Sequence, residues 1–341
     1  MQNLNIHILA IESSCDDTSC AILKNNVVLS NVTANQKVHE QYGGVVPELA
    51  SRDHQKNIVP VVDAALKEAG ITLEELDAVA VTLGPGLMGS LLVGLCFAKS
   101  LSLALGIPLI EVNHMHGHIL AHFIKEDEKS IFPEFPFLCL TVSGGHTQLV
   151  VVKGHLSFDV LGETIDDAVG EAFDKAAKVM GLPYPGGPLI DKHAKNGDSR
   201  KFNFAFTKVP GYDYSFSGIK TSFLYFIQNN LQKNKAFVSD NLEDICASYQ
   251  GHLINVLLKN AKLALKDTEI KQLAIAGGVS VNSELRRQVK ALEAELGIKT
   301  FIPKTKYCTD NAAMIGITAH YKYLNKEFSK LGVTPLTRMK V

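Results

Sequence analysis

Apolar runs separated by short polar turns occur twice along the chain in the same order. Residues 8–34 contain three apolar runs divided by turns rich in Ser, Asp and Asn, and residues 137–162 repeat this arrangement with a Ser-Gly-Gly turn. Short runs rich in Val, Ile and Leu between such turns are typical of β-strands. Each segment therefore predicts a meander of three strands.

The segments that follow the two meanders also match. Residues 76–98 predict a strand, a Gly-Pro-Gly loop and a helix, and residues 270–292 predict a strand, a Gly-Gly loop and an amphipathic helix. An internal duplication of this kind determines the whole fold. We therefore expect an α/β fold of two duplicated lobes, with ligands binding in the interlobe cleft beyond the carboxyl ends of the strands.

The length of 341 residues also favours two lobes, because a single core rarely grows to that size. The last helix, expected within residues 308–324, is predicted to pack back on the first lobe. We therefore expect an N-terminal lobe of residues 1–134 plus 310–341, which carries the histidine pair described below. Residues 135–309 would form a C-terminal lobe that carries nucleotide-binding loops.

The amino-acid composition excludes few classes of protein. The chain is 46% hydrophobic and 20% charged, with a formal net charge of −1, which is ordinary for a globular protein and gives no globally basic surface. The six cysteines form no C-x-x-C pair and fit a reducing compartment. The N-terminal residues lack the pattern of a signal peptide, and residues 87–106, interrupted by Lys99, read as a buried helix. We therefore expect a cytoplasmic protein with no membrane attachment.

Three glycine loops follow predicted strands, at residues 82–90, 142–148 and 276–282. Glycine allows backbone amides to surround phosphate oxygens, and a following helix N-terminus favours an anion. One such loop is usually only a tight turn, but three in a duplicated frame predict a nucleotide site. None matches the P-loop or dinucleotide-binding pattern.

Four histidines lie within residues 113–122, a segment that predicts a helix. His114 and His118 share one helix face at a spacing of four, as do His118 and His122, whereas His116 points elsewhere. A pair of imidazoles at this spacing commonly binds Zn²⁺ or Fe²⁺, although hydrogen-bonded helix histidines are an equal alternative. A third ligand would be needed, and spacing alone does not select Asp310 from the other acids. No H-E-x-x-H motif is present, which argues against a metallopeptidase of that type.

Acidic residues cluster after the first strand and in a predicted helix. Each is compatible with turn chemistry or an ordinary ion pair as well as with a functional role. The residues are Glu12, Asp16, Asp17, Asp166, Asp167, Glu171 and Asp174.

Taken together, eight ordered motifs resemble the TsaD family. They run from about residue 8 to residue 320 and read IESSCDDTSCAIL, GPGLMGSLLVG, NHMHGHILAH, VSGGHTQLVVV, IDDAVGEAFDKAAKVMGLPYPGGP, FSFSGIKT, AIAGGVSVN and CTDNAAMIG. The resemblance implies the fold of the actin, Hsp70 and sugar-kinase superfamily. It also implies transfer of a threonylcarbamoyl group from threonylcarbamoyl-AMP to the exocyclic amine of the adenosine 3′ of the anticodon, in tRNAs reading ANN codons.

The resemblance further implies a site and a set of partners. One divalent metal, Fe²⁺ in preference to Zn²⁺, would be bound by His114, His118 and Asp310. ATP or AMP would be able to occupy the same cleft as the substrate. Expected partners are tRNA, a TsaB-type paralogue, a TsaE-type ATPase and a TsaC- or Sua5-type synthase that supplies the substrate. The implied substrate contacts are Val142, Ser143, Gly144, Gly145, His146, Asp174, Gly187, Asp191 and Asn282.

For acyl transfer from a mixed anhydride to an amine, the enzyme must position two substrates and accept a proton. Glu12 and Asp16 are the candidates for orienting the amine or taking its proton. His116 stands where family members often carry an acid or an amide, which leaves open whether His116 or His122 joins the metal site. The alternative functions are a small-molecule kinase or ATPase of the same fold, a metallopeptidase and a non-catalytic scaffold.

Overall fold

The computed structural model describes residues 5–205 and 209–341, which divide into two compact units. Unit 1 comprises Met1–Pro133, Gly154–Ser157 and Pro303–Val341, and unit 2 comprises Glu134–Lys153 and Phe158–Ile302. The chain returns to unit 1 at Pro303, seven residues before the predicted boundary at 310. The reason is local, because Lys304 and Lys306 form ion pairs with Glu126 of unit 1.

The sheet of unit 1 has the order β3-β2-β1-β4-β5. β1 pairs antiparallel with β2, and β2 with β3, which gives the predicted meander. β4 and β5 are added parallel to β1, so that the carboxyl ends of β1, β4 and β5 lie at one edge of the sheet. The strands are β1 (His7–Glu12), β2 (Thr18–Lys24), β3 (Val27–Ala34), β4 (Ala78–Gly84) and β5 (Leu109–Asn113).

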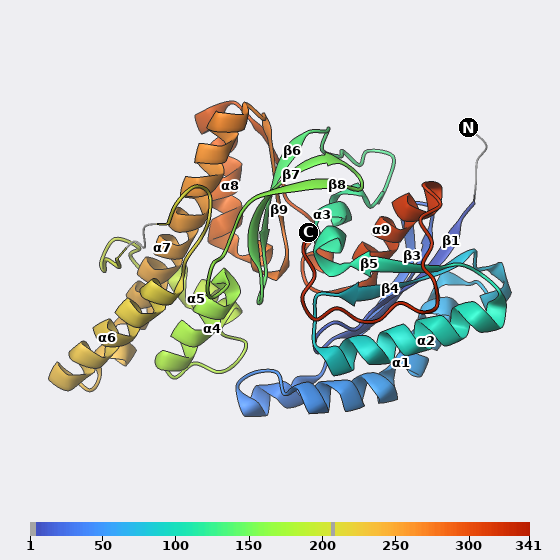
Figure 1. Cartoon of the computed structure of the whole chain (residues 1–341). Coiled ribbons are helices and arrows are strands. Elements are labelled where there is room, and N and C mark those ends of the chain that lie inside the picture. The colour runs from blue at the N-terminus through green and yellow to red at the C-terminus, as the bar shows by residue number, and fades with distance from the viewer. Residues whose placement is uncertain (1–4, 206–208) are drawn as a thin grey trace. The chain divides into compact units, whose positions relative to one another are not determined.

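Helices cover both faces of this sheet (Figure 1). α1 (Pro47–Ala69) and α2 (Met88–Leu105) pack on one face, and α3 (His114–Leu120) and α9 (Ala312–Leu324) pack on the other. Short 3-10 helices cover Lys37–Tyr42, Leu73–Glu75, Ala121–Phe123 and Thr305–Tyr307.

Among the described residues, one helix, α2, is long and apolar enough to span a membrane, with a mean hydropathy of 1.7. Length and composition alone are weak evidence for such a span. Leu95 and Ala98 of α2 are buried in the core of unit 1, and Leu91 on the same helix is also buried. The sequence predicted a buried helix. In the structure 33% of its residues are buried, so the helix is buried along one face only.

The sheet of unit 2 repeats that of unit 1, with the order β10-β9-β6-β7-β8. β6 pairs antiparallel with β7 and parallel with β9, as β1 pairs with β2 and β4. This equivalence confirms the predicted duplication and the α/β fold class. The strands are β6 (Phe137–Val142), β7 (Thr147–Gly154), β8 (Ser157–Glu163), β9 (Gln272–Ala276) and β10 (Lys299–Phe301).

Unit 2 differs from unit 1 in the helices inserted between its third and fourth strands. The described residues of this insertion form four helices, and large aromatic side chains of the insertion, including Tyr214, Phe223 and Tyr249, are buried in a core that belongs to unit 2. A further 3-10 helix (Gly278–Val281) precedes the last helix of the unit. The α-helices are α4 (Val169–Val179), α5 (Gly186–Ala194), α6 (Ser217–Lys233), α7 (Phe237–Thr268) and α8 (Ser283–Leu296).

Candidate metal centre and nucleotide-binding loops

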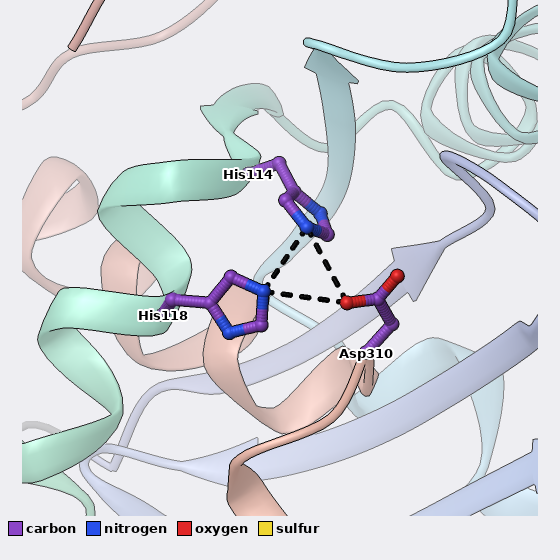
Figure 2. Close-up of side chains that lie close together, drawn as sticks. All are labelled: His114, His118 and Asp310. Atoms are coloured by element: carbon purple, nitrogen blue, oxygen red, sulfur yellow. Dashed lines mark hydrogen bonds and ion pairs between the residues drawn. The ribbon is translucent and has the colours of Figure 1, made fainter. Parts of the chain in front are cut away.

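The histidine pair lies on α3, which begins directly after β5. The side chain of Asn113 caps the helix, since its Oδ1 accepts a hydrogen bond from the amide of Met115 at 2.8 Å. His114 and His118 stand one helical turn apart on the same face, and both are buried at 6% and 1% exposure. Their rings meet edge to face (Figure 2).

Asp310 reaches the histidine pair from the segment before α9. The Nε2 atoms of His114 and His118 lie 3.1 Å apart, and Asp310 Oδ1 lies 3.4 and 3.3 Å from them. Two ligands about 2.1 Å from one ion are separated by about 3.0 Å in octahedral and about 3.4 Å in tetrahedral geometry. The three donor atoms therefore already have the spacing of metal ligands (Figure 2).

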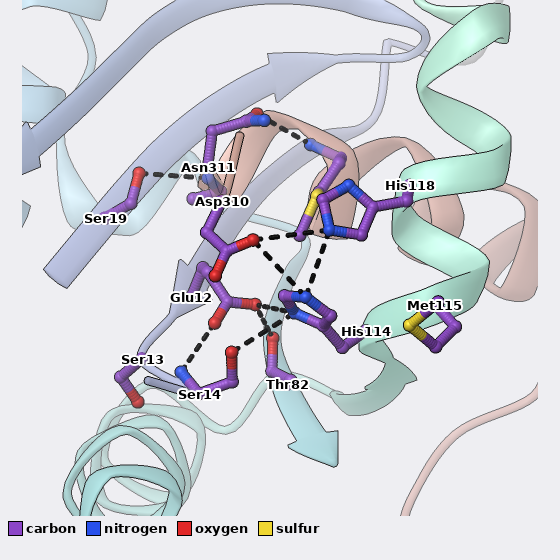
Figure 3. Close-up of polar contacts among 12 residues, drawn as sticks. Glu12, Ser13, Ser14, Ser19, Thr82, His114, Met115, His118, Asp310 and Asn311 are labelled. Atoms are coloured by element: carbon purple, nitrogen blue, oxygen red, sulfur yellow. Dashed lines mark hydrogen bonds and ion pairs between the residues drawn. The ribbon is translucent and has the colours of Figure 1, made fainter. Parts of the chain in front are cut away.

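Glu12, at the end of β1, lies beside Nδ1 of His114. Its Oε2 is 3.1 Å from His114 Nδ1 and accepts the hydroxyl of Thr82 at 2.5 Å, while its Oε1 accepts the amide of Ser14 at 2.5 Å (Figure 3). The residue is completely buried. The role predicted for Glu12 in orienting the substrate amine or taking its proton stays a prediction. Both oxygens accept hydrogen bonds within the protein, and the contact of the carboxylate with Nδ1 of His114 leaves Nε2 for a ligand.

The charges of this cluster are strongly linked. Burial alone would lower the pKa of His114, but the carboxylates of Asp310 and Glu12 raise it well above its usual value. Burial would raise the pKa values of Glu12 and Asp310, but the charge of His114 lowers both. Burial lowers the pKa of His118. The two carboxylates thus favour a positive charge between them, and a divalent cation with neutral imidazoles would supply it.

The other polar residues near the histidines lie outside this group of donors. Asp16 is half-buried in the turn after β1, and His116 and His122 are half-buried on the histidine segment. Among the described residues, the group with ligand spacing comprises His114, His118 and Asp310 and includes none of these three. Burial lowers the pKa of His116 to about 4.

Reasoning from the sequence missed the residues that position this centre. Ser14 places its Oγ 3.2 Å from His114 Nδ1, and Thr82 binds Glu12. Asn113 and Asn311 cap α3 and α9, the two helices beside the ligands. An asparagine directly before a helical run is a recognised N-cap signal, so the two asparagines were detectable, whereas Ser14 and Thr82 were not.

The predicted substrate contacts gather at the carboxyl ends of β6 and β9 in unit 2. Val142 ends β6, and a Cβ on Gly277 would lie 2.4 Å from its carbonyl oxygen, so the loop after β9 passes close by. Ser143 and His146 close the next loop, since the Ser143 amide donates to the His146 carbonyl at 2.8 Å. Gly144 and Gly145, between them, are exposed.

The remaining predicted contacts hold neighbouring loops together. Asp174 Oδ1 accepts the amides of Gly186 and Gly187 at 2.8 and 3.2 Å, and burial raises the pKa of Asp174. Asp191 binds the backbone amide and hydroxyl of Ser283. Asn282 caps α8 through Oδ1. The structure therefore brings the predicted set together, with these side chains already engaged in shaping the loops.

The repeated sheets and the shared strand order define an α/β protein of the actin, Hsp70 and sugar-kinase fold. Full-length HypF superimposes with a TM-score of 0.63 at 13% identity, over 96% of this chain and 48% of that one. Component A of the Acidaminococcus fermentans (R)-2-hydroxyglutaryl-CoA dehydratase gives a TM-score of 0.52 at 14% identity, over 94% and 99% of the two chains. These likenesses concern the fold alone.

The model of the TsaD family, tRNA N6-adenosine threonylcarbamoyltransferase, matches residues 27–317, and the chain belongs to this family. The tRNA N6-adenosine threonylcarbamoyltransferase of Christiangramia forsetii is 59% identical over 100% of both chains. That of Porphyromonas gingivalis is 56% identical over 99% of both. The chain is thus an acyltransferase that modifies adenosine in tRNA.

Proposed function

We propose that this enzyme transfers the threonylcarbamoyl group from threonylcarbamoyl-AMP to the adenosine 3′ of the anticodon in tRNAs reading ANN codons, with the help of one divalent metal. The observation that carries the metal assignment is the convergence of His114 Nε2, His118 Nε2 and Asp310 Oδ1 at ligand spacing. Two imidazoles and a carboxylate suit Fe²⁺, our preferred ion, and also Zn²⁺.

The chain's own residues would divide the work of the transfer. When bound, the metal would supply a Lewis acid and a template for oxygen atoms of the substrate. Glu12 fixes the ring of His114 through Nδ1, so that the ligand set is oriented before substrate binds. Glu12 and Asp16 are the candidates for orienting the amine or accepting its proton, and Asp16 is partly accessible in the turn after β1.

The loops of unit 2 would bind the AMP portion. Exposed Gly144 and Gly145 offer backbone amides beside the N-terminus of α4, where a phosphate is favoured. Residues 142–146 with Gly187 would contact the nucleotide, and Asp174, Asp191 and Asn282 would support those contacts by holding the loops. ATP or AMP would bind to the same loops.

We infer that the enzyme acts in the cytoplasm, without membrane attachment, and together with other proteins. The inferred partners besides tRNA are a TsaB-type paralogue, a TsaE-type ATPase and a TsaC- or Sua5-type synthase as the source of threonylcarbamoyl-AMP. A formal net charge of −1 supports a shared tRNA-binding surface, because phosphate binding needs local positive charge.

The test is mass spectrometry of nucleosides from bulk tRNA in cells depleted of this protein. Loss of threonylcarbamoyl-adenosine should be reversed by the wild type but not by His114→Ala, which removes a ligand and should leave the fold intact by circular dichroism. His122→Ala is the matched control, since it changes a histidine of the same segment outside the donor group, and it should restore the nucleoside. Full restoration by His114→Ala would refute the metal role.

A further inference from the structure

The C-terminal segment after α9 runs back along unit 1 instead of ending at the helix (Figure 1). It first pairs with the edge strand β5, where the amide of Ser329 donates to the carbonyl of Leu109 at 2.8 Å. The hydroxyl of Ser329 accepts the amide of Glu111 at 2.9 Å. The segment thereby covers part of an otherwise unpaired strand edge.

Beyond β5, the segment reaches the end of β4 and the loop that follows it. The amide of Leu336 donates to the carbonyl of Leu83 at 2.9 Å, and the amide of Gly86 donates to the carbonyl of Thr337 at 3.4 Å. A Cβ on Gly84 would lie 1.9 Å from the carbonyl oxygen of Leu336, so no side chain fits there. Glycine at the last position of β4 is therefore required by the approach of the C-terminal backbone.

The segment ends at the residue that begins the histidine helix. The carbonyl of Lys340 accepts a hydrogen bond from Nδ2 of Asn113 at 2.8 Å, while Oδ1 of the same amide caps α3. One side-chain amide thus joins the C-terminal backbone to the helix that carries His114 and His118. With both ends of the amide bonded, its orientation is fixed.

A second route leads from the same segment to the other side of His114. The loop that Thr337 contacts continues to Leu87, whose amide donates to the carbonyl of Ser14 at 2.8 Å. The Oγ of Ser14 lies 3.2 Å from Nδ1 of His114 (Figure 3). Both routes end at the ring that must be correctly placed to bind a metal.

We propose that residues 333–341, the C-terminal strap, are a positioning element of the metal centre, acting through Asn113 and through the loop at Gly86. The proposal rests on the metal centre proposed above. It assigns the strap a role in ligand geometry, beyond covering a sheet edge, because its last residues bind where the ligand helix starts.

The test compares the metal affinity of the wild type with that of two full-length variants and one shortened variant. Asn113→Ser keeps a capping oxygen but is too short to reach the Lys340 carbonyl. Truncation after Pro335 removes the acceptors of both Thr337 and Lys340. Ser329→Ala is the matched control, since it removes a hydrogen bond between the same C-terminal segment and Glu111 but leaves the contacts with Asn113 and Gly86 in place. Zn²⁺ affinity is measured by competition with a chromophoric chelator, and the visible spectrum of the Co²⁺-loaded protein reports ligand geometry.

We expect Asn113→Ser and the truncation to lower Zn²⁺ affinity at least tenfold and to alter the Co²⁺ spectrum, as losses of outer-shell partners do. Ser329→Ala should stay within about twofold of the wild type. Wild-type affinity in Asn113→Ser, or an equal loss in Ser329→Ala, would overturn the role of the strap alone. A wild-type protein that binds no metal would instead overturn the metal centre itself.

Discussion

The carboxylate of Glu12 contacts the ring of His114 directly. Glu12→Gln keeps the shape of the side chain but removes the charge that faces Nδ1. We expect a loss of metal affinity of about 10- to 100-fold with little change in stability, because the ring loses its charged partner. Competition with a chelator and thermal unfolding of the metal-free protein measure the two effects.

Glu12→Ala provides the contrast. It leaves the hydroxyl of Thr82 and the amide of Ser14 without their acceptor, at a cost of about 1–3 kcal/mol each. It should therefore destabilise the protein strongly as well as weaken metal binding. Equal metal affinity in Glu12→Gln and the wild type would show that the carboxylate is needed only for packing.

We predict that the free energy of unfolding depends on pH through Asp17, which lies in the same turn as Asp16. Burial is the main cause that raises its pKa to about 7, although Asn35 donates a hydrogen bond to it at 2.6 Å. The folded state therefore keeps a proton that the unfolded state releases above about pH 4. The free energy of unfolding falls as pH rises from about 4 to about 7 and then levels off.

Asp17→Asn should remove this loss, because the amide resembles the protonated acid and still accepts the hydrogen bond. Its advantage over the wild type should grow between pH 5 and pH 7 and reach about 1–2 kcal/mol, less than the full shift implies because the residue is partly exposed. Urea denaturation at pH 5, 6, 7 and 8 measures it. A difference that is constant with pH would point to a change in packing instead.

Among the elements, those with strong local patterns were predictable. The two meanders and the helix with His114 and His118 follow from alternation of apolar runs and turns and from a spacing of four. Asp310 could not be chosen from spacing, because 191 residues separate it from His118 and only the packing of α9 beside α3 brings them together. The burial of Glu12 was hidden for the same reason, since its partner Thr82 lies on another strand.

The first turn of α4 packs closely against the loop after β6. A Cβ on Gly170 would lie 2.6 Å from the carbonyl oxygen of Ser143 and 2.8 Å from Cα of Gly144, and backbone atoms do not yield easily. Gly170→Ala should displace this loop, lower stability by about 1–3 kcal/mol and weaken AMP binding, measured by calorimetry.

Gly251→Ala, inside α7, is the control for Gly170→Ala. Its Cβ would meet Cβ of Ser199 at 3.5 Å, an ordinary contact, so stability should be kept or rise slightly. AMP binding by Gly170→Ala at wild-type strength would mean that the loop after β6 does not hold the nucleotide.

At the scale of the whole molecule, the two units have separate hydrophobic cores. The core of unit 1 includes Leu9, Val81 and Leu95, and that of unit 2 includes Phe173, Tyr249 and Leu273. The proposed metal ligands all belong to unit 1, and the proposed nucleotide contacts all belong to unit 2. Each ligand should therefore stabilise a different part of the chain, since a ligand stabilises only the structure to which it binds.

Scanning calorimetry of the metal-free protein should then show two unfolding transitions. Zn²⁺ at 100 times its dissociation constant adds about 2.7 kcal/mol, which for a unit of this size raises one transition by roughly 5–10 °C. AMP should raise the other transition alone. His114→Ala should abolish the effect of Zn²⁺ and preserve that of AMP, which assigns the transitions to the units. A single transition that both ligands raise would mean that the two cores unfold together. Calorimetry would then give no separate stabilisation of each unit by its own ligand.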